Sequence, residues 1–131
     1  MNKLNIPDDS YMMCMAGLNL PCRSVQTGYF RSDLVDIIRP HILYMIKLHK
    51  GGHDNFHQRV IQTRLIIPDA LPMEVVAIDD ASNPEEAAAK LFRMWRKSPG
   101  HWKAINSICR YYCYSLGQEN NTYYGIGLII T

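Results

Sequence analysis

The chain lacks any apolar stretch long enough to cross a membrane. Its longest apolar runs, such as Val75 to Ile78 and Ile126 to Ile130, are a few residues long, whereas a spanning helix needs about 20 residues. The first ten residues carry one lysine, then two aspartates, and no apolar core of the kind that a secretory signal contains. We therefore expect no membrane span and no conventional secretion, and we expect the chain to work in the cytoplasm or within an assembled particle.

The chain also lacks a marked excess of charge of either sign. Lys and Arg number 14 and Asp and Glu number 12, so the net charge is +2 with neutral histidines. A dedicated nucleic-acid binder is usually much more basic. Cations and aromatics do interleave between Lys90 and Tyr112, but we interpret these cations as the solvated side of a helix. The sequence therefore predicts no nucleic-acid partner.

Cysteine is scarce, and its spacing does not indicate a metal site. Cys14, Cys22, Cys109 and Cys113 are the four cysteines, and the last two lie four residues apart beside bulky aromatics. A Cys-x-x-Cys pair of the zinc-binding kind is missing. We interpret all four as reduced and mostly buried thiols in a reducing compartment.

A length of 131 residues with 47% hydrophobic content suits a single domain over residues 1–131. Helices are predicted over 7–16, over 32–50 with Ser32 as N-cap and Pro40 inside, and from the N-cap Asn83 to about 97. In that third helix we expect Ala87, Leu91, Met94 and Trp95 on the inner face.

Extended segments are predicted over 59–67 and 75–78, and a short helical stretch after His101. A hairpin is predicted from 111–116 and 123–130. Helices combined with a terminal pair of strands indicate an α+β layered fold.

The predicted hairpin is rich in tyrosine. An antiparallel sheet commonly buries one face, and tyrosine is favoured at interfaces, so we expect one face of the hairpin to meet another protein or a second copy of the chain. The interface candidates are Tyr111, Tyr112, Tyr114, Tyr123 and Tyr124.

Several motifs follow one another at characteristic intervals. His53-Asp54-Asn55-Phe56-His57-Gln58-Arg59 precedes Met73-Glu74-Val75-Val76-Ala77, then Asn83-Pro84-Glu85-Glu86, then Trp95-Arg96-Lys97-Ser98-Pro99-Gly100-His101, and finally Gly125-Ile126-Gly127. In this order the chain resembles the CAP superfamily, the cysteine-rich secretory, antigen 5 and pathogenesis-related proteins, and its compact bacterial branch in particular. The resemblance covers about residues 32–131, and residues 1–31 diverge.

This resemblance implies a three-layer α-β-α sandwich with a central antiparallel sheet and a shallow cleft. In the cleft, His53 and His101 match the two histidines of the family and Glu74 matches an acid. Ser98 stands where some members have a second acid, and the bacterial branch shares this serine. Met73 and Val75 depart from the Gly and Asn that flank the acid in the family.

The cleft residues allow two interpretations. His53, Glu74 and His101 could be three zinc ligands with a fourth position open to water, in which case the imidazoles would be the main ligands and Glu74 a supporting one. They could equally be a hydrogen-bonded trio that binds nothing. Ser98 precedes a proline and lacks a Gly-x-Ser-x-Gly elbow, so no activated nucleophile is evident.

Our expectation is a CAP-like domain that works without catalysis, by binding or as a structural component of a larger assembly such as a virus or phage particle. The alternative is a divalent-metal-dependent hydrolase or cell-wall-active enzyme that uses the His/Glu cleft. A lipid-binding module, as in some relatives, would need an apolar groove motif, and none stands out in the sequence.

Overall fold

The computed structural model describes residues 27–131. The predicted helix over 7–16, together with Cys14 and Cys22, lies outside the described residues. The described elements are β1 (Tyr29–Phe30), a short 3-10 helix η1 (Ser32–Leu34), α2 (Val35–Leu48), α3 (Phe56–Ile66), β2 (Pro72–Asp80), α4 (Pro84–Lys97), α5 (Pro99–Ile105), β3 (Tyr111–Glu119) and β4 (Thr122–Ile130).

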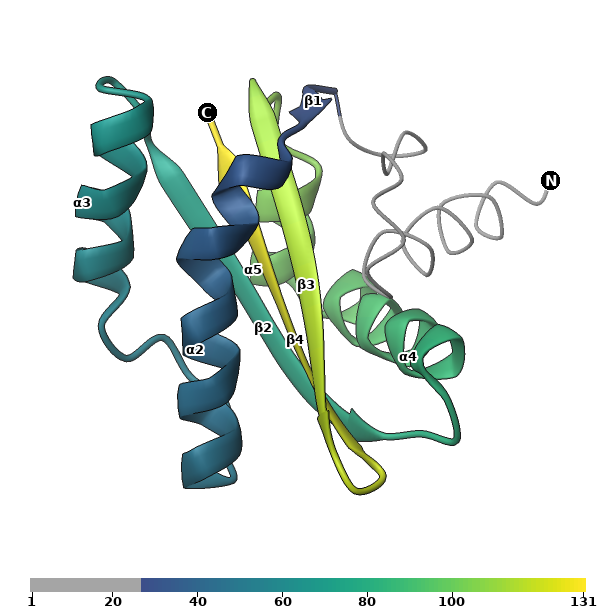
Figure 1. The fold of residues 1–131 in the computed structure, drawn as a ribbon. Helices are drawn as coiled ribbons and strands as arrows, with labels where there is room; N and C mark the ends of the chain where they lie inside the picture. Colours follow the sequence, from purple (N-terminus) through teal and green to yellow (C-terminus); the bar gives the residue numbers. More distant parts are fainter. Residues whose placement is uncertain (1–26) are drawn as a thin grey trace, which may run out of the picture.

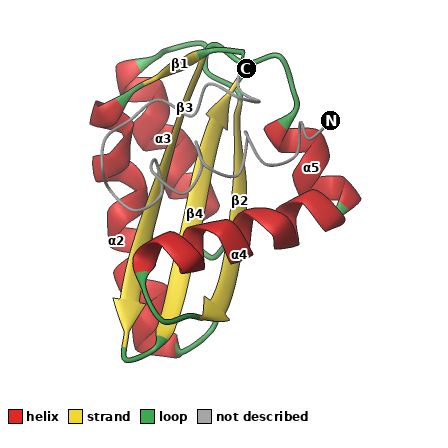
Figure 2. Cartoon of the chain, turned by 90° about the vertical axis from the view of Figure 1, so that its right-hand side faces the viewer, coloured by secondary structure: helices red, strands yellow, loops and turns green. Residues whose placement is uncertain are grey.

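These elements form a sheet between two layers of helices (Figure 1). The strand order is β1-β3-β4-β2. The three long strands are antiparallel, but β1 runs parallel to β3, so the sheet is mixed and differs in this from the purely antiparallel sheet that was expected. In Figure 2, α4 and α5 lie in front of the sheet and α2 and α3 behind it. The α+β class predicted from the sequence is therefore confirmed.

Successive side chains of a strand point to opposite faces of the sheet, so each strand contributes apolar side chains to both helical layers. In β4, Ile126 and Leu128 pack in the core beneath α2, whereas Ile129 packs in the core beneath α4 and α5. Because both faces of the sheet are covered, β4 is buried over nearly its whole length and β3 from Tyr112 to Ser115.

Covering of both faces corrects the expectation for the tyrosines. Four of the five interface candidates are 1–3% exposed, and Tyr111 is half-buried. Tyr112 and Tyr114 belong to the core beneath α4 and α5, and Tyr124 to the core beneath α2. The prediction that the hairpin presents a tyrosine face to a partner is wrong, because it assumed that only one face of the sheet is covered. The buried candidates are Tyr112, Tyr114, Tyr123 and Tyr124.

The helix α4 follows its sequence signals closely. Asn83 caps it by accepting a hydrogen bond from the backbone N–H of Glu86 (2.8 Å), and Pro84 takes the first helical position. Leu91 and Trp95 are buried as expected, but Met94 is 42% exposed and does not belong to the inner face. The short helix expected near His101 is α5, which starts at Pro99.

The helix α2 departs from prediction at its two ends. Ser32 starts the 3-10 turn η1 and makes no capping hydrogen bond in front of α2. Pro40 lies inside the continuous helix. The helix ends at Leu48, before Gly51 and Gly52, and His49 adopts the left-handed conformation that closes it (φ 56°).

The helix α3 was predicted as an extended segment over 59–67, and this prediction is wrong. Its buried side chains are Arg59 and Thr63, which are polar, while Ile61 and Leu65 are exposed. These two buried residues are four apart, as in a helix, but they are polar. A search for apolar periodicity therefore misses the helix. No helix in the described part of the chain has the length and hydropathy that crossing a bilayer requires.

Gly127 in β4 provides a test of the core. A side chain there would place Cβ 2.6 Å from Tyr114 Cδ1 and 2.9 Å from Val75 Cγ2, because the Tyr114 ring lies across the glycine. We expect Gly127→Ala to lower the free energy of unfolding by about 1–3 kcal/mol, the usual cost of overpacking. Urea denaturation measures it. Gly100→Ala is the matched control, since nothing lies within 4 Å of that Cβ, and equal effects of the two substitutions would contradict the packing.

Candidate functional site

The acid Glu74 lies in the edge strand β2 and is almost completely buried, with 1% of its side chain exposed. Its Oε1 accepts a hydrogen bond from Nδ1 of His53 (2.8 Å), which lies in the loop between α2 and α3. A carboxylate can only accept here, so Nδ1 of His53 carries a proton, and Nε2 is the ring nitrogen left for another partner. The ring is about half exposed, so that partner can come from outside the chain.

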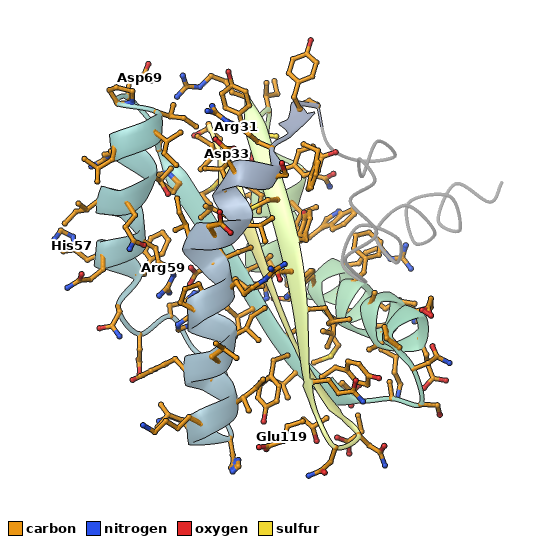
Figure 3. The ribbon with its side chains drawn as sticks, viewed as in Figure 1. Arg31, Asp33, His57, Arg59, Asp69 and Glu119 are labelled. Atoms are coloured by element: carbon orange, nitrogen blue, oxygen red, sulfur yellow. The ribbon has the colours of Figure 1, made fainter. Side chains whose placement is uncertain are left out.

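Arg59 of α3 forms an ion pair with the Glu74 carboxylate. Its Nε donates to Oε2 (2.6 Å) and its Nη2 donates to Oε1 (2.8 Å), a bidentate pair in which the arginine side chain is 5% exposed. Figure 3 shows Arg59 pointing from α3 toward α2. Both oxygens of Glu74 are therefore engaged inside the fold.

The second cleft histidine, His101, lies in the first turn of α5. Its Nδ1 is 3.0 Å from the Oγ of Ser98, the residue that separates α4 from α5. Burial lowers the pKa of His101 below its usual value, and the nearby His53 lowers it further. The ring is therefore neutral at physiological pH.

The residues that the motifs singled out form two hydrogen-bonded pairs. His53 is bonded to Glu74 of β2, and His101 of α5 is bonded to Ser98. The helix α5 packs near β2, and the proximity of His53 contributes to the lowered pKa of His101.

The three-ligand zinc site that the sequence allowed stays a prediction. Among residues 27–131, no three His, Cys, Asp or Glu side chains are grouped so that they could hold a metal ion. Glu74 already accepts three hydrogen bonds, two from Arg59 and one from His53. We assign no metal-dependent step to this arrangement.

Sequence reasoning missed the residues that hold the His53 loop. His41 of α2 donates from Nε2 to the Gly52 carbonyl (2.7 Å), and Arg59 Nη1 donates to the Asp54 carbonyl (2.9 Å). Tyr44 donates its hydroxyl proton to Asp54 Oδ2 (2.9 Å). The signal for Arg59 was present in the motif His-x-x-Phe-x-x-Arg, but nothing in the sequence marked His41 or Tyr44.

The regular spacing of His49, His53 and His57 does not produce a histidine cluster. His49 closes α2, His53 lies in the loop, and His57 belongs to α3. In Figure 3, His57 points away from the molecule on the outer side of α3. Gly51 and Gly52 lie between His49 and His53, in the loop that separates α2 from α3.

The buried pair of Arg59 and Glu74 can be tested by a double-mutant cycle. We expect Arg59→Met and Glu74→Leu each to lower the free energy of unfolding by about 3–5 kcal/mol, because each leaves an uncompensated buried charge. The double variant should lose less than the sum of the two losses. Asp69→Asn, in an ion pair with an 80% exposed aspartate side chain, is the control and should leave stability close to that of the wild type. Additive losses would contradict the coupling.

His41 gives a pH-dependent prediction. Burial is the largest cause that lowers its pKa below 6.5, and the neighbouring Arg59 adds to this. The unfolded chain therefore takes up a proton at a higher pH than the folded chain does. The free energy of unfolding should be at its full value above pH 6.5 and fall as the pH drops below it.

The measurement is urea denaturation between pH 5 and 7.5. Replacement of His41 by Gln should reduce the slope of stability against pH, while the same change at the outward-pointing His57 should leave the slope as in the wild type. An unchanged slope in the His41→Gln variant would contradict the assignment.

Comparison with known proteins bears on the fold alone. No protein-family model matches the chain, and no curated protein matches it. Among solved structures, the chain is similar to an outer surface protein from Borrelia burgdorferi, with a TM-score of 0.66 and 14% sequence identity over 99% of this chain and 92% of that chain. At this identity, the likeness shows that the two chains share an α+β fold.

Proposed function

We propose that the chain is a CAP-like domain that works by binding, without catalysis, as a component of a larger protein assembly such as a virus or phage particle. The observation that carries this proposal is the state of Glu74. Both of its oxygens are bonded within the fold, to Arg59 and His53. The carboxylate therefore acts as a positioning group that fixes His53, and the two imidazoles are left as the groups that meet a ligand.

The CAP-like assignment is supported by where the motifs lie in the fold. The Trp95 to His101 motif forms the junction of α4 and α5, with Trp95 buried against Tyr114. The Gly125 to Gly127 motif lies in the central strand β4, where Gly127 makes room for the same tyrosine ring. Each motif thus has a packing or positioning role that requires its residue types.

An assembly role is supported by the surface of the chain. Large apolar side chains are exposed on α2, on α3 and in the connection from α3 to β2, and the exposed fraction reaches 81% at Leu65. Exposed large apolar side chains are the groups that a protein contact would bury. The residues concerned are Leu43, Ile61, Leu65, Ile66 and Leu71.

The alternative, a divalent-metal-dependent hydrolase or cell-wall-active enzyme, rests on a different feature of the same residues. An imidazole held by a buried carboxylate is a suitable general base or metal ligand. For Glu74 itself to bind a metal, however, the ion would have to share the carboxylate with Arg59, whose guanidinium has no other carboxylate partner among the described residues.

Zinc titration by calorimetry distinguishes the two functions. We expect the wild type to bind no stoichiometric zinc. His53→Ala and His101→Ala, checked for folding, are the test variants, and His57→Ala is the matched control. Stoichiometric binding that is lost in both test variants and kept in the control would overturn the non-catalytic proposal in favour of the metal-dependent enzyme.

Light scattering over a range of protein concentrations tests the assembly role. We expect association, with itself or with a co-purified partner, that weakens when the exposed Leu65 is replaced by Ser. A chain that stays monomeric at high concentration and captures no partner in a pull-down would contradict this role.

A further inference from the structure

The outward edge of β2 can be assigned residue by residue from the ladder that it forms with β4. Leu71 and Thr131 exchange both backbone hydrogen bonds (3.4 and 3.2 Å), and the Ala81 N–H donates to the Asn121 carbonyl (2.9 Å). Directly opposite residues in an antiparallel ladder alternate between bonded and non-bonded pairs. The register therefore directs the backbone groups of residues 73, 75, 77 and 79 toward β4. Those of Glu74, Val76 and Ile78 face outward.

At the two ends of this edge the backbone N–H is missing or hydrogen-bonded, whereas in the middle the backbone groups bond to no described residue. Pro72 has no N–H, while the Asp80 N–H donates to Asp79 Oδ1 (2.8 Å) and the Asp80 carbonyl accepts from Nζ of Lys90 (2.7 Å). Among the described residues, no hydrogen bond uses the backbone N–H or C=O of the three outward residues. Three successive outward donor and acceptor pairs are thus available along one edge.

Within residues 27–131, the middle of this edge carries no bulge, lysine or covering strand. A bulge, an inward lysine or a covering strand commonly blocks an exposed edge, but β2 pairs with β4 without interruption and its Val75 to Ile78 run is uncharged. The edge begins at Glu74, the residue whose side chain holds His53. The open edge therefore starts beside one of the candidate site histidines.

We propose that this edge binds an extended segment of a partner protein, which adds to the sheet as a further strand beside β2. Main-chain hydrogen bonds to Glu74, Val76 and Ile78 would supply the affinity, and His53 and His101 would contact the side chains of the segment from the two faces. This inference rests on the proposed binding role of the cleft and names the kind of ligand that the cleft takes.

A single extended segment fits the edge better than a second copy of the chain. The loop before α3 lies against β2 on one face, with Gly51 close to Val76 and Ile78, and α5 packs near β2 on the other. If the β2 strand of a second copy paired here, its own loop before α3 and its own α5 would come with it. They would then meet the same elements of the first copy beside the paired strands. A lone strand brings only alternating side chains.

The test uses the full chain and random peptides displayed on phage, selected on the wild type. Synthetic versions of the selected peptides are titrated by fluorescence anisotropy against the wild type, Val76→Pro and Val76→Thr. Proline removes the outward N–H without removing a bond to β4, while threonine keeps the N–H and the branched shape. We expect roughly tenfold weaker binding, or more, to Val76→Pro and unchanged binding to Val76→Thr. Ile78→Pro is the second variant if the first does not fold.

Amide hydrogen exchange gives the direct readout. In the free chain, the amides of Glu74, Val76 and Ile78 should exchange much faster than those of Val75 and Ala77, and the bound peptide should slow them by roughly tenfold or more. Selection that yields no peptide, equal binding by Val76→Pro, or no added protection would overturn the proposal. So would a free chain in which these amides are already protected by a second copy.

The histidine variants separate this proposal from the function on which it rests. If His53→Ala and His101→Ala abolish peptide binding and Val76→Pro does not, the cleft binds its ligand but the strand addition is wrong. If Val76→Pro alone abolishes binding, the edge is the binding site and the histidines are not part of it.

Discussion

The ion pair between Arg59 and Glu74 is the interaction on which the arrangement of the site depends. It joins α3 to the edge strand β2, and both of its side chains are buried. Apolar contacts of α3 are few, since its buried residues are polar. A buried pair of this kind adds little net stability compared with an apolar replacement, but its fixed bidentate geometry sets where α3 and the His53 loop lie. The site is therefore organised by a polar interaction within a fold that apolar packing stabilises.

The predictability of the elements follows from which residues carry their periodicity. The helix α4 was predicted well because its cap, its first proline and most of its inner face all follow standard signals. The inward side of α3 consists of an arginine and a threonine, so its sequence resembled an extended segment. The tyrosines were placed in the correct strands, but their burial depended on a second helical layer, which the local sequence does not reveal.

In the candidate site, too, the sequence selected residues but did not predict their contacts. The spacing of the motifs, interpreted through their resemblance to a family, selected His53, Glu74, Ser98 and His101, and the structure pairs His53 with Glu74 and Ser98 with His101. The hydrogen bonds of Glu74 could not be predicted, because the choice between a metal and a guanidinium depends on fine differences in the position of α3. The same limit applies to His41, a buried histidine that holds a loop and has no sequence signature.

The position of β4 in the sheet has a consequence for how the fold is reached. β4 is the last strand along the described chain, yet it lies in the middle of the sheet and pairs with both β3 and β2. During synthesis, β2 lacks this neighbour until about forty residues later, so neither helical layer can close on a finished sheet before β4 is present. Completion of the sheet must then follow the synthesis of β4, with the β3–β4 hairpin as the strand pair that is local in sequence.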